Sequence, residues 1–242
     1  MTKMTKWLLR QPDPHAEVRL FCLPFAGIGA SAFRLWPTLS DKIEICPVQL
    51  PGRENRSAEL VYDNIDDLTN DMLSELQPFL DRPYALFGHC MGALIAYDFT
   101  LKLKQHGVRL PEHLYISASR APHSSQRGFI NTDLSDEELA SLIKSTTLTI
   151  DDPQLLSILL PHAVQLLRKD LEMCNCYQPD LNPISCLITT FAWREDQGTP
   201  CEELLGWRNY GDVTEKMLEG DHFAVQNASS ILLQIIGTDL NK

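Results

Sequence analysis

The sequence lacks the features that would place the protein outside the cell or in a membrane. No run of apolar residues is long enough to span a bilayer, and residues 1–10 lack the apolar core of a signal peptide. The seven cysteines are odd in number and scattered along the chain, which is typical of reduced thiols rather than of a disulfide framework. We therefore expect a cytoplasmic protein with no membrane partner.

The chain also has no excess of positive charge. Its 21 basic and 32 acidic residues give a formal net charge of −11, which argues against nucleic acid or an anionic membrane surface as the main partner. No internal repeat, low-complexity tract or linker divides the 242 residues, which suffice for one substantial core. We predict a single domain over residues 1–242 and expect a monomer.

Apolar segments alternate with helical patterns along most of the chain. The predicted strands cover residues 17–23, 43–50, 84–89, 113–119, 184–193 and 213–217. The predicted helices lie around Phe33 and Trp36 and over residues 64–80, 91–105, 201–207 and 225–236. This alternation predicts an α/β fold with a mainly parallel, doubly wound sheet.

Residues 133–178 break the alternation because they carry only helical patterns. One helix starts near residues 134–138, and another starts at Pro153. Two helices without a strand between them are typical of an insertion over the carboxyl edge of the sheet, where open α/β sheets place their active sites. We expect a helical lid there. The alternative is a helical appendage with only a packing role.

The most informative stretch is Gly88-His89-Cys90-Met91-Gly92, between a predicted strand and a predicted helix. This is the strand-turn-helix context of the G-x-S-x-G nucleophile elbow, with cysteine in place of serine. The two glycines suit a strained turn whose neighbours leave no room for side chains. A helix N-terminus also favours a thiolate. The alternative is a cysteine buried in the core between two glycines.

A thiol nucleophile needs a base, and the base needs an acid that holds its tautomer. Cys90, Asp196 and His222 follow predicted strands in the order nucleophile, acid, histidine. Because the carboxyl ends of parallel strands share one edge, we expect the three side chains to converge. His123 and His162 are the competing bases, whereas the side chain of His89 is expected to point away from that of Cys90.

The acid and the oxyanion donors are less tightly specified than the nucleophile. Glu195 and Asp98 are alternatives to Asp196 as the acid, and Asp221 is expected to be a loop residue. An acyl-transfer site also needs N–H donors for the oxyanion. We predict that the backbone N–H groups of Met91 and Ala26 supply them.

Several motifs together resemble the type II thioesterases, the stand-alone editing hydrolases of nonribosomal peptide and polyketide synthesis. The similarity runs nearly end to end. Its motifs are Leu23–Gly27 with Phe33 and Trp36, Gln49–Arg56, Gly88–Ala93, Leu167–Tyr177 and Gly220–Phe223.

The resemblance implies an α/β-hydrolase fold with a helical lid and the roles given above for Cys90, Asp196, His222, Ala26 and Met91. It also implies hydrolysis of acyl groups carried on the phosphopantetheine arm of acyl or peptidyl carrier-protein domains, with no cofactor or metal in the enzyme itself. Most members carry serine in place of Cys90, although some have cysteine, so Cys90 is either the natural nucleophile or a replacement for serine. The residue before the histidine is commonly glycine, and here it is aspartate.

Two other functions remain open from the sequence. The first is an acyltransferase, in which a thiol or alcohol accepts the acyl group from Cys90. The second is a non-catalytic scaffold that docks on a carrier domain. Cys174 and Cys176 are spaced too tightly, and lack a second ligand pair, for a convincing metal site. We expect a carrier to dock on a local basic patch, for which the candidates are Arg53, Arg56, Arg168 and Lys169.

Overall fold

One six-stranded sheet organises the part of the chain that the structure describes, which in this computed structural model is residues 5–124, 134–146 and 152–241. The strand order is β2-β1-β3-β4-β5-β6, and every neighbouring pair is parallel. The strands are β1 (Val18–Leu23), β2 (Ile43–Pro47), β3 (Tyr84–His89), β4 (His113–Ser117), β5 (Leu187–Trp193) and β6 (Val213–Leu218).

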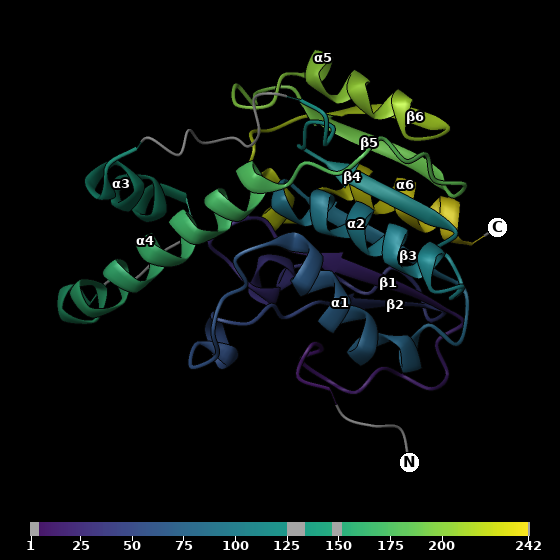
Figure 1. Cartoon of the computed structure of the whole chain (residues 1–242), viewed down its shortest axis with the longest axis horizontal. Coiled ribbons are helices and arrows are strands. Elements are labelled where there is room, and N and C mark those ends of the chain that lie inside the picture. Colours follow the sequence, from purple (N-terminus) through teal and green to yellow (C-terminus); the bar gives the residue numbers. More distant parts are fainter. Residues whose placement is uncertain (1–4, 125–133, 147–151, 242) are drawn as a thin grey trace.

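Helices cover both faces of this sheet (Figure 1). One face carries α1 (Ile65–Leu76) and α2 (Met91–Gln105), and the other carries α6 (Ser230–Leu240). The short helix α5 (Cys201–Leu204) connects β5 to β6. The predicted α/β class with a parallel, doubly wound sheet is therefore confirmed.

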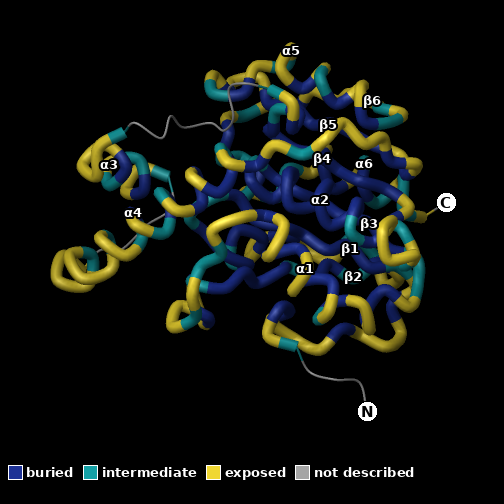
Figure 2. Tube along the Cα trace, in the orientation of Figure 1, coloured by how far each residue is buried: buried dark blue, intermediate teal, exposed yellow. Residues whose placement is uncertain are grey.

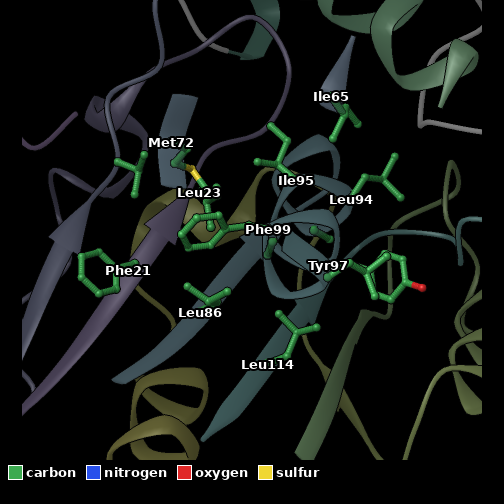
Figure 3. Close-up of a cluster of buried hydrophobic side chains, with 14 of the residues drawn as sticks. Phe21, Leu23, Ile65, Met72, Leu86, Leu94, Ile95, Tyr97, Phe99 and Leu114 are labelled. Carbon is green, nitrogen blue, oxygen red and sulfur yellow. The ribbon is translucent and has the colours of Figure 1, made fainter. Parts of the chain in front are cut away.

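Alternate residues of the strands fill the two layers of the core. Phe21 and Leu23 of β1 and Leu86 of β3 point toward Met72 of α1 and Ile95 of α2 (Figure 3). The residues between them in the strands point to the opposite face and pack toward α6. This period of two is what a strand buried on both faces requires.

The order of the strands creates a crevice at the carboxyl edge. The chain leaves β1 toward β2 on one side and later returns to β3 on the other side. Leu23 and Gly88 are register partners, so β1 and β3 end at the same level. The loop after β1 (the β1 loop, residues 24–31) and the turn after β3 thus lie at the topological switch point, where ligands bind in open α/β sheets.

Two helices, α3 (Asp136–Thr146) and α4 (Pro153–Cys176), project from the body of the molecule (Figure 1). The end of α4 nearer the body is largely buried, whereas its first turns are exposed (Figure 2). The helices match the insertion predicted over residues 133–178, of which residues 133 and 147–151 lie outside the described residues.

Some predicted element boundaries were wrong. The segment around Phe33 forms only a 3-10 turn, η1 (Ala30–Phe33), because Pro37 follows closely and disfavours helical backbone in the residue before it. The last helix starts at Ser230 rather than Val225, because Ala228 adopts a left-handed conformation with φ 54° and interrupts the apolar periodicity. The strand predicted to Leu50 ends at Pro47, because the N–H of Gln49 donates to Trp7 of the N-terminal segment instead of to β1.

The two edges of the sheet differ in exposure. Beyond β2, Leu8 of the N-terminal segment forms an antiparallel bridge with Val48. At the other edge, residues 214–217 of β6 are exposed on both faces and include Glu215 and Lys216. Among the described residues, no helix has both the length and the apolar character needed to cross a membrane.

The close approach of backbone at Gly92 gives a direct test of the packing between α2 and β1. A Cβ at Gly92 would overlap the backbone carbonyls of Leu23 and Pro24, whereas a Cβ at Gly237 in α6 would meet no atom within 4 Å. We expect Gly92→Ala to lower the unfolding free energy by about 3 kcal/mol or more. Gly237→Ala is the matched control and should raise it by about 0.5–1 kcal/mol. Chemical denaturation measures both, and equal stability of the two variants would contradict this packing.

Candidate active site

The turn after β3 holds Cys90 in a strained backbone conformation, with φ 52° and ψ −115°. The backbone N–H of Cys90 donates to the carbonyl of Ser117 at the end of β4, with an N···O distance of 2.8 Å. A Cβ at Gly88 would overlap the backbone of Gly92. The two glycines therefore let helix α2 start directly on top of the strand, with the half-buried side chain of Cys90 at the carboxyl edge.

The structure brings His222 and Asp196 to this cysteine. The Nδ1 atom of His222 lies 2.8 Å from Oδ2 of Asp196, and the ring also hydrogen-bonds with the side chain of Cys90. Oδ1 of Asp196 accepts from the backbone N–H groups of Gly198 and Thr199, each at 2.9 Å. Because Nδ1–H donates to the carboxylate, Nε2 is the ring nitrogen left to face the sulfur.

The surroundings of His222 favour its charged form. Burial opposes a positive charge on the ring, but the hydrogen bonds to Asp196 and Cys90 outweigh burial and raise the pKa of His222 to about 9. A base beside a thiol is charged once it has taken the proton from sulfur, so this environment stabilises the state in which Cys90 is activated.

The other predicted acids and bases lie elsewhere. Glu195 is exposed, and Asp98 instead accepts hydrogen bonds from Thr69 and from Tyr177 at the end of α4. Asp221 is exposed and accepts from the backbone of its own turn. Of the competing histidines, His162 is exposed on α4, and Nδ1 of His123 pairs with the hydroxyl of Tyr210.

His89 has a closer relation to the site than the sequence indicates. Its fully buried ring lies edge-on to the ring of His222, with 4.9 Å between centroids. Trp193 Nε1 donates to Oγ of Ser117, which lies 2.9 Å from Nδ1 of His89. Burial holds the pKa of His89 well below its usual value. A neutral imidazole thus packs beside the candidate base. In the sequence, the only sign of this contact is that His89 precedes Cys90 in the elbow.

Two backbone N–H groups near Cys90 have no acceptor among the described residues. Ala26 and Met91 line the same cavity as Cys90. Met91 is the first residue of α2, so its N–H has no partner within the helix. In the described part of the chain, no hydrogen bond uses the N–H of Ala26. Both groups can therefore donate to an oxygen that develops charge beside Cys90.

The β1 loop owes its shape to side chains from outside it. After Ala26, the backbone N–H groups of Gly27, Gly29 and Ala30 donate to Asp170 at 2.8 Å, to Glu54 at 3.0 Å and to Gln49 at 3.0 Å, respectively. Glu54 also accepts from the backbone of Ser31. The loop is thus held by N–H groups that point away from the cavity, and the N–H of Ala26 stays available.

The prediction that Arg53 and Arg56 form a docking patch was wrong, because both are buried. The guanidinium of Arg53 forms a bidentate ion pair with Asp170, at 2.7 and 2.9 Å. Arg56 pairs with Glu59, donates to the carbonyl of Gln49 and stacks over the ring of Trp7. Their charges are neutralised inside the protein and cannot meet a partner's surface.

The cavity beside Cys90 is small and mostly apolar. Its volume of about 20 Å³ has room for little more than a water molecule. Leu94 of α2 and Leu171 and Cys174 of α4 line it. Cys174 is buried and lines this cavity, whereas Cys176 is exposed and is not among the lining residues.

Comparison with known proteins places this site in context. The thioesterase domain family model matches residues 18–240. GrsT, the gramicidin S biosynthesis protein of Aneurinibacillus migulanus, is 33% identical over 98% of this chain and 94% of its own length.

Solved structures give the same picture. The RedJ thioesterase from the prodiginine biosynthetic pathway in Streptomyces coelicolor is 35% identical, with a TM-score of 0.81 over 93% of this chain and 86% of that chain. YbtT, a type II thioesterase from the yersiniabactin NRPS/PKS biosynthetic pathway, is 26% identical, with a TM-score of 0.79 over 95% of each chain.

The raised pKa of His222 predicts how stability depends on pH. The folded-state pKa of about 9 lies above the unfolded value of 6.5. The stabilisation is therefore complete below about pH 6.5 and is lost as the pH rises toward 9. We expect the unfolding free energy to fall by about 1 kcal/mol per pH unit between pH 6.5 and roughly 8.5.

Urea denaturation of the wild type and of His222→Gln isolates this contribution, which should be absent from the variant. The series stops near pH 8.5 because the buried thiols of Cys22 and Cys186, whose pKa values burial raises, destabilise the fold at higher pH. The same slope in both proteins would show that His222 is not the group responsible.

Proposed function

The chain belongs to the thioesterase family, and we propose that it clears aberrant or stalled acyl groups from the phosphopantetheine arms of carrier-protein domains in nonribosomal peptide or polyketide synthesis. Membership of the family makes it a thioester hydrolase. The wider role is supported by its relatives, among them a gramicidin S biosynthesis protein and a type II thioesterase of an NRPS/PKS pathway.

One observation carries the proposed mechanism: a half-buried cysteine at a switch-point elbow meets a histidine held by a buried aspartate. In acylation, His222 takes the proton of Cys90, and the sulfur adds to the thioester carbonyl carbon. The carbonyl electron pair moves to oxygen, where the N–H groups of Ala26 and Met91 donate to it. Collapse expels the pantetheine thiolate, which receives the proton from His222.

In deacylation, His222 takes a proton from water as the water adds to the acyl-cysteine carbonyl carbon. The second tetrahedral intermediate uses the same two donors. Its collapse breaks the bond to sulfur, releases the carboxylic acid, and returns the proton from His222 to Cys90. The acyl enzyme is itself a thioester, so acylation exchanges two bonds of similar energy and leaves the acyl group activated toward water.

We propose that α3 and α4 act as the lid over this site. Leu171 and Cys174 of α4 close a cavity with room for about one water molecule, so an acyl chain enters only when these side chains move. On the outer surface of α4, Lys169 pairs with Asp63 and Arg168 with Asp136. Lys169, which is exposed, and Arg168, which is half-buried, remain the candidates from the predicted basic patch for contact with an acidic carrier.

The first experiment is intact-mass analysis of the protein after mixing with acetyl-loaded carrier protein, sampled over time. We expect a transient acetyl adduct, because the sulfur of Cys90 is acylated first. Water then hydrolyses the adduct and releases acetate. Cys90→Ala should form no adduct and release acetate at least about 10³-fold more slowly. Cys90→Ser is the matched control that keeps a nucleophile of similar shape.

The alternatives give different results. An adduct that persists until a thiol or alcohol is added would indicate an acyltransferase instead. A Cys90→Ser variant that turns over faster than the wild type would indicate that cysteine stands in the place of the natural serine. No adduct and no acetate, with longer acyl chains also tried, would indicate the scaffold.

The size of the cavity predicts which acyl-chain lengths the enzyme prefers. Leu171→Ala removes a side chain that closes the cavity, so kcat/KM for a hexanoyl thioester should rise relative to that for acetyl by about tenfold. Val164→Ala is the control, because Val164 is buried in the same helix against α3 rather than on the cavity wall. An unchanged hexanoyl-to-acetyl ratio in Leu171→Ala would contradict the assignment of this cavity to the acyl group.

A further inference from the structure

Asp170 of the lid helix α4 touches the loop that carries a proposed oxyanion donor. We propose that Asp170, with Arg53, is a positioning residue that couples the position of the lid to the oxyanion hole. This inference rests on the proposed function, because it assigns a task within that reaction to a buried ion pair that lies outside the Cys90–His222–Asp196 group.

Asp170 is held in one position by burial and by several hydrogen bonds. Its side chain is fully buried, 143 residues away in sequence from the glycine it binds. Oδ2 accepts from the backbone N–H of Gly27 and from Arg53, and Oδ1 accepts a second bond from Arg53. A carboxylate with three charge-assisted or backbone donors at 2.7–2.9 Å is tightly placed.

The contact between Asp170 and Gly27 restrains the backbone beside Ala26. The N–H of Gly27 belongs to the peptide that follows Ala26, so holding it restrains the backbone of Ala26, a residue that lines the cavity beside Cys90. Gly27 needs its positive φ of 82°, and a Cβ there would lie 3.3 Å from the side chain of Leu167. Leu167, Asp170, Leu171 and Cys174 share one face of α4, so the same surface that closes the acyl cavity also orders the β1 loop.

A further support is electrostatic. A lone carboxylate next to the oxyanion hole would oppose the negative charge that develops on the substrate oxygen. Arg53 neutralises it and is anchored by its own bonds to the carbonyls of Ile28 and Pro51. Removing Arg53 should therefore lower kcat more than neutralising Asp170 does, because it leaves the buried carboxylate of Asp170 unpaired next to the oxyanion hole.

The consequence is that the hole is complete only when this part of α4 is in place. If the helix withdraws, Gly27 loses its acceptor and the peptide beside Ala26 is free to turn. The coupling acts on the chemical step, so its loss should lower kcat with little change in KM for a small substrate that does not need the lid surface.

The test uses the full chain with acetyl-pantetheine as the substrate. Asp170→Asn keeps an acceptor for Gly27 and should lower kcat by about tenfold, whereas Asp170→Leu keeps none and should lower it by about a hundredfold. The kcat of Arg53→Gln should be lower than that of Asp170→Asn. Asp63→Asn is the matched control, since it breaks the exposed ion pair of the neighbouring Lys169 and should leave kcat unchanged.

Two further measurements separate positioning from general damage to the fold. Alkylation of Cys90 by iodoacetamide, followed by peptide mass analysis, needs the nucleophile and base but no oxyanion hole, so its rate should stay within about twofold of wild type in Asp170→Asn. A trifluoromethyl ketone analogue of acetyl-pantetheine adds to the sulfur and places an oxyanion in the hole. Its affinity should fall by the same factor as kcat.

Equal losses of alkylation, ketone affinity and kcat in Asp170→Asn would overturn the proposal, as would wild-type kcat in Asp170→Leu. These outcomes differ from failure of the proposed function. A wild-type protein that hydrolyses no thioester would remove the function whatever the variants do, whereas an active wild type with insensitive variants would remove only the role of Asp170.

Discussion

The left-handed backbone at Cys90 is the constraint on which the site depends. It forces the chain to reverse within one residue, and only glycine at positions 88 and 92 leaves space for the strand and helix that meet there. The strain points a reactive side chain out of the sheet while the start of α2 supplies an N–H beside it. Strand β3 pairs in parallel with β1 on one side and with β4 on the other, and β4 pairs with β5, so the β1 loop and the Asp196 turn lie at the same edge as the elbow.

Near that elbow, side chains from other segments hold the backbone of the β1 loop. Asp170, Glu54 and Gln49 accept hydrogen bonds from the N–H groups of Gly27, Gly29 and Ala30, which restrains the loop where it has no regular secondary structure. The buried charges of Arg53 and Asp170 are retained because they satisfy each other and the loop together. Positioning of this kind costs no reorganisation when charge develops on a substrate.

The sequence was a good guide wherever the determinant is local. The elbow and the placing of Cys90, Asp196 and His222 after strands follow from short patterns, and β3 and α2 agree with the predicted ranges. It was a poor guide to Arg53, which was assigned to the surface because charged side chains usually lie there. Its partner Asp170 is 117 residues away, and no spacing rule links them. The packing of His89 against His222 was not predicted for a similar reason, since its partner Ser117 belongs to another strand.

The uneven exposure of the two sheet edges bears on how the protein behaves when crowded. An open strand edge can template the addition of strands from other molecules. At β6, Glu215 and Lys216 point to opposite faces, so an incoming strand would have to desolvate a charge on either side. At the other end, the bridge between Leu8 and Val48 covers the chain just beyond β2. Charge at β6 and this bridge next to β2 both disfavour the addition of strands from other molecules to the sheet that carries the site.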